Sequence, residues 1–359
     1  MVLKRDSAMF LHAIFASQVL YKNEETKEKN WIRDSIIQRI DISGPLTVAD
    51  YMRIVLTSPT SGFYMKQDVF GSKGHFTTSP EISQIFGELV AVWLINEWQR
   101  FNASKPFRVI ELGPGRGTLS MDISRVLSQF RHTHECASLH LVEISPYLTT
   151  VQEQTLCGHT TVRNKEFKGT HNSITTTGLP VTWYQTLDQV PNASGFSVFI
   201  AHEFLDALPI HKFQKNDKQE WREVLVNVDK NRELQFMLSN HPTPASKYFI
   251  PSKVEGNHFE VCPEAVVLTE KIIKRINEND GCFLICDYGY DGSAANRDTF
   301  RAFREHTLWN PLKEPGTADL TADVDFAALK SHVSDKATVF GTVTQQHFLQ
   351  NLGIDLRLQ

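Results

Sequence analysis

Short apolar runs alternate with amphipathic segments through the last two thirds of the chain. Five of these runs have the length and the aliphatic content of buried strands, and they cover residues 107–112, 139–143, 181–184, 196–201 and 282–288. Residues 118–127 and 263–279 instead repeat apolar positions at helical spacing. Strands that alternate with helices pair in parallel, because the right-handed crossover returns each strand to the same direction. The pattern therefore predicts an α/β fold with a doubly wound, largely parallel sheet.

Residues 31–106 follow a different, helical and looped pattern. Thr47 and Asp50 form a capping signature in front of apolar positions at helical spacing. A segment rich in glycine and aromatic residues follows at 61–76. Its plainer interpretation is a surface loop, but loops of this length in compact domains are often binding lids. We predict that residues 31–106 are a helical N-terminal extension that carries a lid.

The sequence Ser79-Pro80-Glu81 is typical of a helix start. Serine is a frequent N-cap residue, proline fits the first turn, and a carboxylate favours the positive end of the helix dipole. The apolar positions that follow predict one buried helix from Ser79 to about Trp98.

Two other segments depart from the alternation of strands and helices. Residues 216–258 contain two candidate strands of a hairpin, at 221–228 and 233–237, followed by a loop rich in proline, serine and lysine. The N-terminal residues combine a basic and apolar stretch with a polar tract. We therefore divide the chain into a targeting or disordered segment at 1–30, the extension at 31–106, and a core at 107–359 with an insertion at about 216–258.

Composition narrows the classes of function. The chain has 359 residues, 41% of them hydrophobic and 22% charged, which is typical of a globular protein with a sizeable core. Its net charge of -4 gives no support for nucleic acid as a partner. The five cysteines form no CxxC pair and the 14 histidines no HExxH spacing, so we predict neither a metal site nor disulfides. The sequence has no apolar run of about 18–20 residues, so no membrane span is predicted.

The most informative motif is the strand-to-helix turn at residues 109–118. Its glycines, Gly113, Gly115 and Gly117, let the backbone turn sharply and approach a ligand closely. The third glycine comes one residue earlier than in the G-x-G-x-x-G fingerprint of dinucleotide-binding proteins. An acid, Glu111, precedes the first glycine by two residues. This spacing suits a ligand without a pyrophosphate and with a cationic centre, and S-adenosylmethionine is such a ligand.

Residues around this turn are candidate cofactor ligands. Glu143 ends the second predicted strand, where a carboxylate accepts both ribose hydroxyls; the plainer alternative is a solvated strand-end acid. Glu111 either binds the ammonium group of the ligand or orders the loop by accepting backbone N–H bonds. Arg116, inside the turn, either pairs with the ligand carboxylate or lies in solvent. Trp183 and Tyr184 either flank an adenine ring or pack in the core.

A second cluster of acids follows the fourth predicted strand. Glu203 and Asp206 are three residues apart in the segment 201–209, and Asp287 ends the late strand. Because the carboxyl ends of parallel strands meet at one edge of a sheet, we expect these acids near the cofactor. Paired carboxylates suit a guanidinium, and they draw its positive charge away from the nitrogen that attacks a methyl group. The alternative is that Glu203 or Asp206 only caps the following turn.

Six segments taken together resemble one family, and they span roughly residues 40–359. These segments are Ser61–Tyr64, Phe76–Ser83 with Phe86–Glu88, Glu111–Thr118, Glu203–Pro209, Asp287–Gly289 and Pro315–Phe326. The chain resembles the MidA family of class I methyltransferases, whose mitochondrial members are assembly factors of respiratory complex I. They symmetrically dimethylate an arginine of a core subunit of its peripheral arm. The resemblance implies a Rossmann-like core and a type II, symmetric protein arginine methyltransferase that is required for complex I assembly.

The resemblance also assigns residues and a location. It implies that the Gly113–Gly117 loop and Glu143 bind S-adenosyl-L-methionine, and that the helix that carries Ser79 and Glu81 helps to close the site. It implies that the partner is a core subunit of the complex I peripheral arm. It further implies the mitochondrial matrix as the location, with a transit peptide within residues 1–30.

Two features depart from the family pattern. Many bacterial members have asparagine where this chain has His202, and members usually continue by a further helical segment beyond the position of Gln359.

Three other functions are compatible with the residues. One is an assembly chaperone that binds the cofactor only as a structural ligand, and another is a small-molecule methyltransferase. A dehydrogenase has the least support, because the third glycine comes too early.

Overall fold

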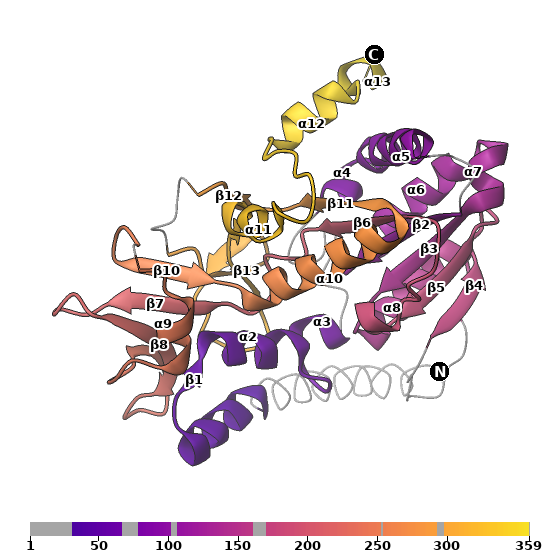
Figure 1. Ribbon diagram of the computed structural model, residues 1–359. Coiled ribbons are helices and arrows are strands. Elements are labelled where there is room, and N and C mark those ends of the chain that lie inside the picture. Colours follow the sequence, from indigo (N-terminus) through magenta and orange to yellow (C-terminus); the bar gives the residue numbers. More distant parts are fainter. Residues whose placement is uncertain are drawn as a thin grey trace, which may run out of the picture.

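A six-stranded sheet in the order β11-β6-β2-β3-β5-β4 forms the centre of the molecule (Figure 1). The computed structural model describes residues 31–66, 78–101, 106–160, 170–252, 254–292 and 298–358. Neighbouring strands are parallel except at one edge, where β4 is antiparallel to β5. The prediction of an α/β fold is confirmed. The strands are β2 (Phe107–Leu112), β3 (Ala137–Val142), β4 (His171–Ile174), β5 (Pro180–Tyr184), β6 (Phe196–His202) and β11 (Gly281–Cys286).

Helices cover both faces of this sheet. Val109 of β2 belongs to a core formed with α5 (Gln84–Arg100) and α6 (Thr118–Ser128). The next residue, Ile110, belongs to a second core formed with α10 (Pro263–Asn279) on the other face. Successive side chains of a strand point to opposite faces, so one strand supplies both cores. All residues of β2 are buried, which is typical of a strand covered on both sides.

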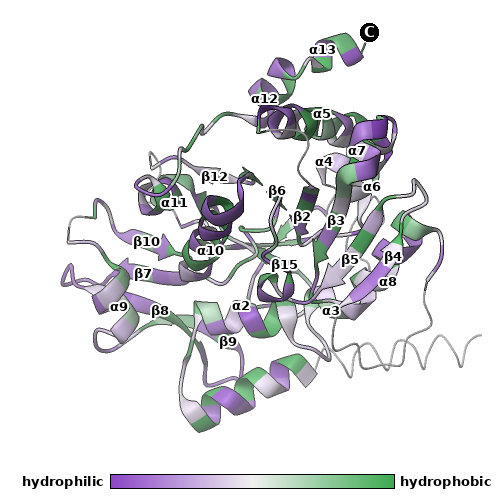
Figure 2. Cartoon of the chain, turned by 45° about the vertical axis from the view of Figure 1, so that its right-hand side comes forward, coloured by the Kyte–Doolittle hydropathy of each residue, from purple (hydrophilic) through white to green (hydrophobic). Residues whose placement is uncertain are grey.

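The N-terminal helices pack with the inserted strands into a further core. The helical residues 31–43 and α2 (Val48–Thr57) contribute apolar side chains to it, and Figure 2 shows the alternation of hydrophobic and hydrophilic residues along these helices. The strands belong to a five-stranded antiparallel sheet, in which the predicted hairpin is confirmed as β8 and β9. Its strands are β1 (Leu46–Thr47), β7 (His211–Lys215), β8 (Trp221–Val228), β9 (Leu234–Leu238) and β10 (His258–Val261).

Shorter elements connect these units. A three-stranded sheet has the order β14-β13-β15, and β12 pairs with β16. None of the helices within the described ranges is long and apolar enough to cross a membrane. The remaining strands are β12 (Gly289–Tyr290), β13 (Arg301–Arg304), β14 (Thr307–Trp309), β15 (Asp319–Thr321) and β16 (Val324–Asp325). The remaining helices are α3 (Phe63–Lys66), α4 (Ser79–Ile82), α7 (Arg131–Cys136), α8 (Pro146–Cys157), η1 (Leu187–Gln189), α9 (Pro244–Phe249), α11 (Phe326–Val333), α12 (Gln345–Asn351) and α13 (Ile354–Arg357).

The prediction of one helix from Ser79 to Trp98 is wrong. The chain forms α4 and α5 instead, with Ser83 between them in an extended conformation at a φ of -155°. The hydroxyl of Ser83 accepts a hydrogen bond from the amide of Ile85 at 3.2 Å, so the serine that caps a helix here is Ser83 and not Ser79. A serine side chain competes with the backbone for N–H donors, and it therefore starts a new helix within an apolar pattern.

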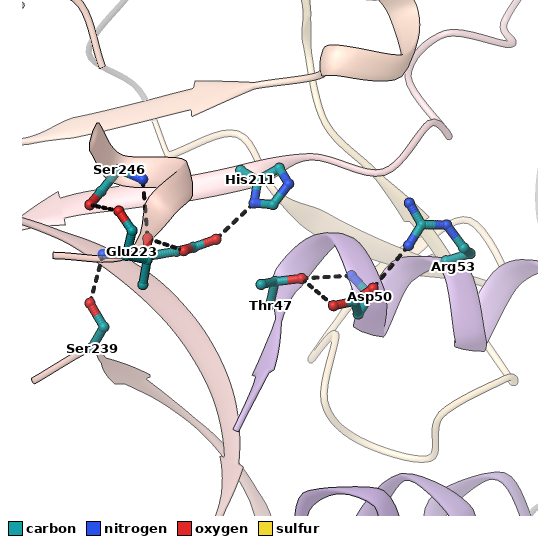
Figure 3. Close-up of polar contacts among 8 residues, drawn as sticks. Thr47, Asp50, Arg53, His211, Glu223, Ser239 and Ser246 are labelled. Carbon is teal, nitrogen blue, oxygen red and sulfur yellow. Dashed lines mark hydrogen bonds and ion pairs between the residues drawn. The ribbon is translucent and has the colours of Figure 1, made fainter. Parts of the chain in front are cut away.

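Parts of two predictions lie outside the described residues. The transit peptide falls within residues 1–30, and most of the predicted lid falls within 67–77. The capping signature at Thr47 is confirmed, because its hydroxyl accepts a hydrogen bond from the amide of Asp50 at 3.0 Å (Figure 3).

A buried carboxylate ties the five-stranded sheet to α9, as Figure 3 shows. Glu223 of β8 is 1% exposed. Its Oε1 lies 2.7 Å from Nδ1 of His211, and its Oε2 accepts a hydrogen bond from the hydroxyl of Thr243, the N-cap of α9, at 2.5 Å. Its amide donates to the hydroxyl of Ser239 at 3.1 Å. Polar groups of β7 and of the N-cap of α9 therefore depend on this one side chain.

Removal of this carboxylate should destabilise the fold. We expect Glu223→Ala to lower the free energy of unfolding by about 1–3 kcal/mol, because the half-buried side chains of His211 and Thr243 lose their partner. Glu220→Ala is the control, since Glu220 is exposed and pairs with Arg222; its loss should cost less than about 1 kcal/mol. Urea unfolding followed by circular dichroism measures both, and equal midpoints for the two variants would contradict the prediction.

Candidate active site

The turn between β2 and α6 has the geometry that its glycines predict. Gly113, Gly115 and Gly117 have φ values of 61°, 55° and 82°, in the left-handed region that favours glycine. The amide of Gly113 donates to the carbonyl oxygen of Val142 at 3.0 Å, which ties the turn to the end of β3. A Cβ atom at Gly113 would lie 2.5 Å from Cδ2 of Phe204, in the loop after β6. The turn therefore presents bare backbone where two strands end side by side.

Glu143, directly after β3, is buried and held by donors from α8 and its N-cap. Its Oε1 accepts from the amide of Ser145 at 2.8 Å, and its Oε2 from Nε2 of Gln152 at 3.0 Å. Gln152 also donates to the carbonyl oxygen of Gly115 at 2.8 Å, and its Oε1 accepts from the indole N–H of Trp183 at 3.0 Å. Burial raises the pKa of Glu143 to about 7. One glutamine side chain thus links Glu143, the glycine turn and the core.

Glu111 lies beneath the same turn. Its side chain is buried, and its carboxylate accepts a hydrogen bond from the hydroxyl of Ser120 on α6. Burial raises the pKa of Glu111 to about 7, against the effect of the Ser120 hydrogen bond. The charge of Glu143 raises it further. Two buried carboxylates thus flank the turn, a charge distribution that suits a cationic ligand.

A residue of α4 contacts the turn. Nη1 of Arg116 lies 3.6 Å from Oε1 of Glu81. The side chain of Glu81 is 9% exposed and that of Arg116 is 42% exposed. Ser79 has a different position: its hydroxyl accepts from Nε2 of Gln345 at 2.9 Å, and it is not among the described residues that line the cavity below. Glu81 therefore meets the turn through Arg116, while Ser79 meets the C-terminal segment.

The loop after β6 carries two carboxylates. Glu203 has a φ of 48°, a costly conformation for a residue with a side chain and one that is common at functional sites. Its amide donates to the carbonyl oxygen of Cys286 at 2.9 Å. Burial raises the pKa of Glu203 to about 7, and the charge of Asp287 raises it further. Burial and the charges of Asp287, Asp319 and Glu203 raise the pKa of Asp206 well above its usual value.

Asp287 lies behind this loop. Its Oδ2 accepts from the amides of Phe204, Leu205 and Asp206 at 3.1, 2.8 and 3.3 Å. Within the described ranges it is not one of the residues that line the cavity, whereas Glu203 and Asp206 both are. This is the position of a side chain that orders the loop.

A cavity of about 850 Å³ joins the two groups of residues. Trp183 does not line it and is 1% exposed in the core, whereas residues 185–187 do line it. The described ranges contain no group of three His, Cys, Asp or Glu side chains arranged to hold a metal. The side of the turn contributes Glu81, Glu111, Gly113, Gly115, Arg116 and Glu143. A second group of lining residues comprises Tyr64, His202, Glu203, Asp206, Asp319 and Thr321.

Sequence reasoning missed three residues near this cavity. The hydroxyl of Tyr64 on α3 donates to Oδ1 of Asp319 on β15 at 2.6 Å, and burial raises the pKa of Asp319 to about 6. Both lie in segments that carry the family resemblance, which is the signal that could have found them. The third, Gln152, lies outside those segments, and only the fold brings it to Glu143.

The fold and the cavity together define a class of protein. A glycine turn at a helix N-terminus, with an acid after the neighbouring strand, is the arrangement of an α/β protein that binds a nucleoside cofactor at the carboxyl edge of its sheet. A family model described as "Putative S-adenosyl-L-methionine-dependent methyltransferase" matches residues 89–343. The chain belongs to this family of S-adenosyl-L-methionine-dependent methyltransferases, which confirms the resemblance found in the sequence.

Curated relatives cover most of the chain. The chain is 47% identical to the protein arginine methyltransferase NDUFAF7, mitochondrial, of Danio rerio, over 90% of this chain and 77% of that protein. It is 46% identical to the Homo sapiens protein of the same name, over 90% of this chain and 74% of that protein. A crystal structure of a Burkholderia thailandensis protein bound to S-adenosyl-homocysteine matches with a TM-score of 0.75. That match covers 92% of this chain and 83% of the other at 23% identity, so it shows the fold.

Proposed function

We propose that this chain is a protein arginine N-methyltransferase of the mitochondrial matrix. Its product would be symmetric dimethylarginine on a core subunit of the complex I peripheral arm. The observation that carries the arginine assignment is the pair of carboxylates, Glu203 and Asp206, in the cavity that also contains the glycine turn. The names of the curated relatives support the acceptor class and the mitochondrial location. The family resemblance supports the symmetric product, the complex I subunit and a role in complex I assembly.

We assign the cofactor to the side of the glycine turn. The fit rests on bare backbone at Gly113, where a Cβ would collide with Phe204, and on the buried carboxylate of Glu143 in position to accept ribose hydroxyls. S-adenosyl-L-methionine supplies an electrophilic methyl group when bound. The residues that we expect to hold it are Gly113, Gly115, Gly117, Glu111, Arg116, Glu143 and Glu81, with Ser79 supporting α4.

The acceptor side provides charge and a proton acceptor. During the reaction an N–C bond forms as the S–C bond breaks, and the acceptor nitrogen releases one proton. Glu203 and Asp206 hold the guanidinium and oppose its charge. The pKa of about 7 suits Glu203 to receive the released proton. Asp287 positions both carboxylates through the loop amides.

We also propose that the six-stranded sheet is the doubly wound core of a class I methyltransferase. The helices on both of its faces support this layout. Our proposed division keeps a core from residue 107 to 359, an extension at 31–106 and an insertion at about 216–258. The shared core of the N-terminal helices and the inserted strands indicates that extension and insertion fold together.

Labelled cofactor tests the proposed activity directly. We expect the chain, incubated with methyl-labelled S-adenosyl-L-methionine and a complex I peripheral-arm fraction, to label one core subunit. Hydrolysis of that subunit should release symmetric dimethylarginine. Absence of transfer to protein would contradict the enzyme, asymmetric dimethylarginine would contradict the product, and label on an unrelated protein would contradict the target.

Replacement of Gln152 should weaken cofactor binding. Gln152→Met keeps the volume but removes the donors to Glu143 and Gly115, so we expect the affinity for S-adenosyl-homocysteine to fall roughly 10-fold. Gln154→Met on the same helix is the control, because Gln154 is exposed. Isothermal titration calorimetry measures both variants, and equal affinities would show that the glutamine does not support the site.

A further inference from the structure

Three polar side chains that line the cavity have no role assigned by the sequence motifs or by the proposed function. Tyr64 comes from α3, and Asp319 and Thr321 come from β15. We propose that these three side chains form a second guanidinium-binding wall. Together with Asp206, this wall selects a planar cation with several N–H donors over an ammonium group. The inference rests on the proposed arginine methyltransferase activity and names the residues that define its acceptor.

A backbone hydrogen bond joins these residues to the loop after β6 that carries Glu203 and Asp206. The amide of Ala322, directly after β15, donates to the carbonyl oxygen of Asp206 at 2.9 Å. The charge of Asp319 raises the pKa of Asp206, so the two carboxylates lie close enough to interact. The hydroxyl of Tyr64 donates to Oδ1 of Asp319 at 2.6 Å and fixes the direction of that carboxylate. Asp206 and Asp319 thus line one cavity, and their charges interact.

Two buried polar atoms on this side have no hydrogen-bond partner among the described residues. They are Oγ1 of Thr321 and Nε2 of His202, in residues that are 6% and 9% exposed and that both line the cavity. Burial lowers the pKa of His202 to about 4, so its ring is neutral and Nε2 is an acceptor when Nδ1 carries the proton. Nε2 lies 3.8 Å from Oε1 of Glu203, beyond hydrogen-bond distance. Unpaired buried acceptors are costly, and a ligand rich in N–H groups satisfies them.

Acidic side chains gather in this part of the cavity. Glu203, Asp206 and Asp319 are its carboxylates, and Arg301 is a cation near them. Nη1 of Arg301 lies 2.7 Å from Oδ1 of Asp323, which balances its charge. A guanidinium brings one positive charge and five N–H donors in a plane, whereas an ammonium brings three donors around one point. Hydrogen-bond acceptors distributed over Glu203, Asp206 and the second wall match the planar guanidinium better than they match an ammonium.

The second wall is also connected to the cofactor side. The hydroxyl of Ser145 donates to the carbonyl oxygen of Tyr64 at 2.7 Å. The amide of the same serine donates to Oε1 of Glu143 at 2.8 Å. One serine thus holds both the carboxylate assigned to the ribose and the residue that orients Asp319. This arrangement fixes the acceptor wall relative to the cofactor, as in-line transfer requires.

The test measures acceptor binding apart from chemistry. The probes are two blocked tripeptides, Gly-Arg-Gly and Gly-Lys-Gly, titrated into the full chain saturated with S-adenosyl-homocysteine. We expect Asp319→Asn to lower the affinity for the arginine peptide about 10-fold to 100-fold, as for loss of a charged hydrogen-bond partner. Tyr64→Phe should lower this affinity by a smaller factor. The preference for arginine over lysine should fall in both variants, which a merely structural role would not produce. Affinity for S-adenosyl-homocysteine should stay unchanged.

Tyr51→Phe is the matched control. Tyr51 is a buried tyrosine whose hydroxyl also donates one hydrogen bond, to the carbonyl oxygen of Pro311 at 2.6 Å, and it does not line the cavity. If Tyr64→Phe and Asp319→Asn keep the wild-type preference for the arginine peptide over the lysine peptide, the proposal of a second guanidinium-binding wall is wrong. The proposed function would not be affected by this result. Loss of S-adenosyl-homocysteine binding in Asp319→Asn would also overturn the second wall. If the wild-type chain neither binds the arginine peptide nor labels the peripheral arm, the proposed function fails and the wall fails with it.

Discussion

Methyl transfer by the Gly113→Ala variant is expected to fall about 100-fold below that of the wild-type chain. An alanine at a φ of 61° costs about 1–2 kcal/mol in backbone strain. The added Cβ would also lie 2.5 Å from Cδ2 of Phe204. Phe204 stands between Glu203 and Asp206 in the chain, so relief of this collision displaces the acceptor loop as well as the cofactor turn. One methyl group therefore disturbs both halves of the site.

Gly44→Ala is the control that separates the effect of backbone strain from the effect of the collision with Phe204. Gly44 has a φ of 84°, and a Cβ there would meet no atom within 4 Å. Both variants carry backbone strain, and we expect Gly44→Ala to lower the unfolding midpoint without a comparable loss of kcat/KM. Steady-state transfer of labelled methyl groups, with calorimetric affinity for S-adenosyl-homocysteine, measures the difference. If the two variants lose activity equally, the contact with Phe204 does not matter to the site.

The parts of the fold predicted from sequence are those encoded locally. The strand at residues 107–112 and the helix at 263–279 are found with the predicted bounds. Each is a run of uniform periodicity that ends at a glycine, a proline or a polar residue, so neighbouring residues suffice to define it. The glycine turn is predictable for the same reason, because left-handed φ values favour glycine at the positions where they occur.

The parts that sequence reasoning missed depend on distant contacts. Strand β15 has only three residues, and its pairing with β13 rather than any pattern of its own makes it a strand. Asp319 and Tyr64 are 255 positions apart in the chain, so no local pattern relates them. Asp287 shows a subtler limit. Its place after an apolar strand predicts that it lies at the carboxyl edge of the sheet, but the direction of its carboxylate is set by three amides of another loop.

Glu203→Gln is expected to lower kcat by about 10²-fold to 10⁴-fold, the range for loss of a general base. Glutamine keeps the shape of the side chain but accepts no proton at neutral pH. In the wild-type chain, kcat/KM should rise with pH and level off above about 7, because the carboxylate must be ionised to hold the guanidinium and to accept its proton. In the variant the part of this limb that Glu203 contributes should disappear, and only a limb from Asp206, whose pKa is also raised, should remain.

Glu305→Gln controls for the backbone. Glu305 also has a left-handed φ, of 49°, but it is exposed and is not among the described residues that line the cavity. Its variant should keep both the rate and the pH limb. A Glu203→Gln variant with a wild-type pH profile would show that another group receives the proton.

Glu203→Gln should lower activity but raise the stability of the fold at alkaline pH. Burial raises the pKa of Glu203 from 4.5 to about 7, and the charges of Asp287, Glu81 and Asp319 add to this, while a hydrogen bond from the amide of Ser79 lowers it. Since the folded chain holds this proton more tightly than the unfolded chain, the stabilising contribution is present below pH 4.5 and is lost as the pH rises through about 7. Ligand-free Glu203→Gln should therefore unfold at a higher temperature than the wild-type chain at pH 8, and the difference should shrink toward pH 5. A catalytic carboxylate held in a buried acidic cavity is expected to destabilise the fold at the pH where it is active, and thermal unfolding scans of both chains across this range test that relation.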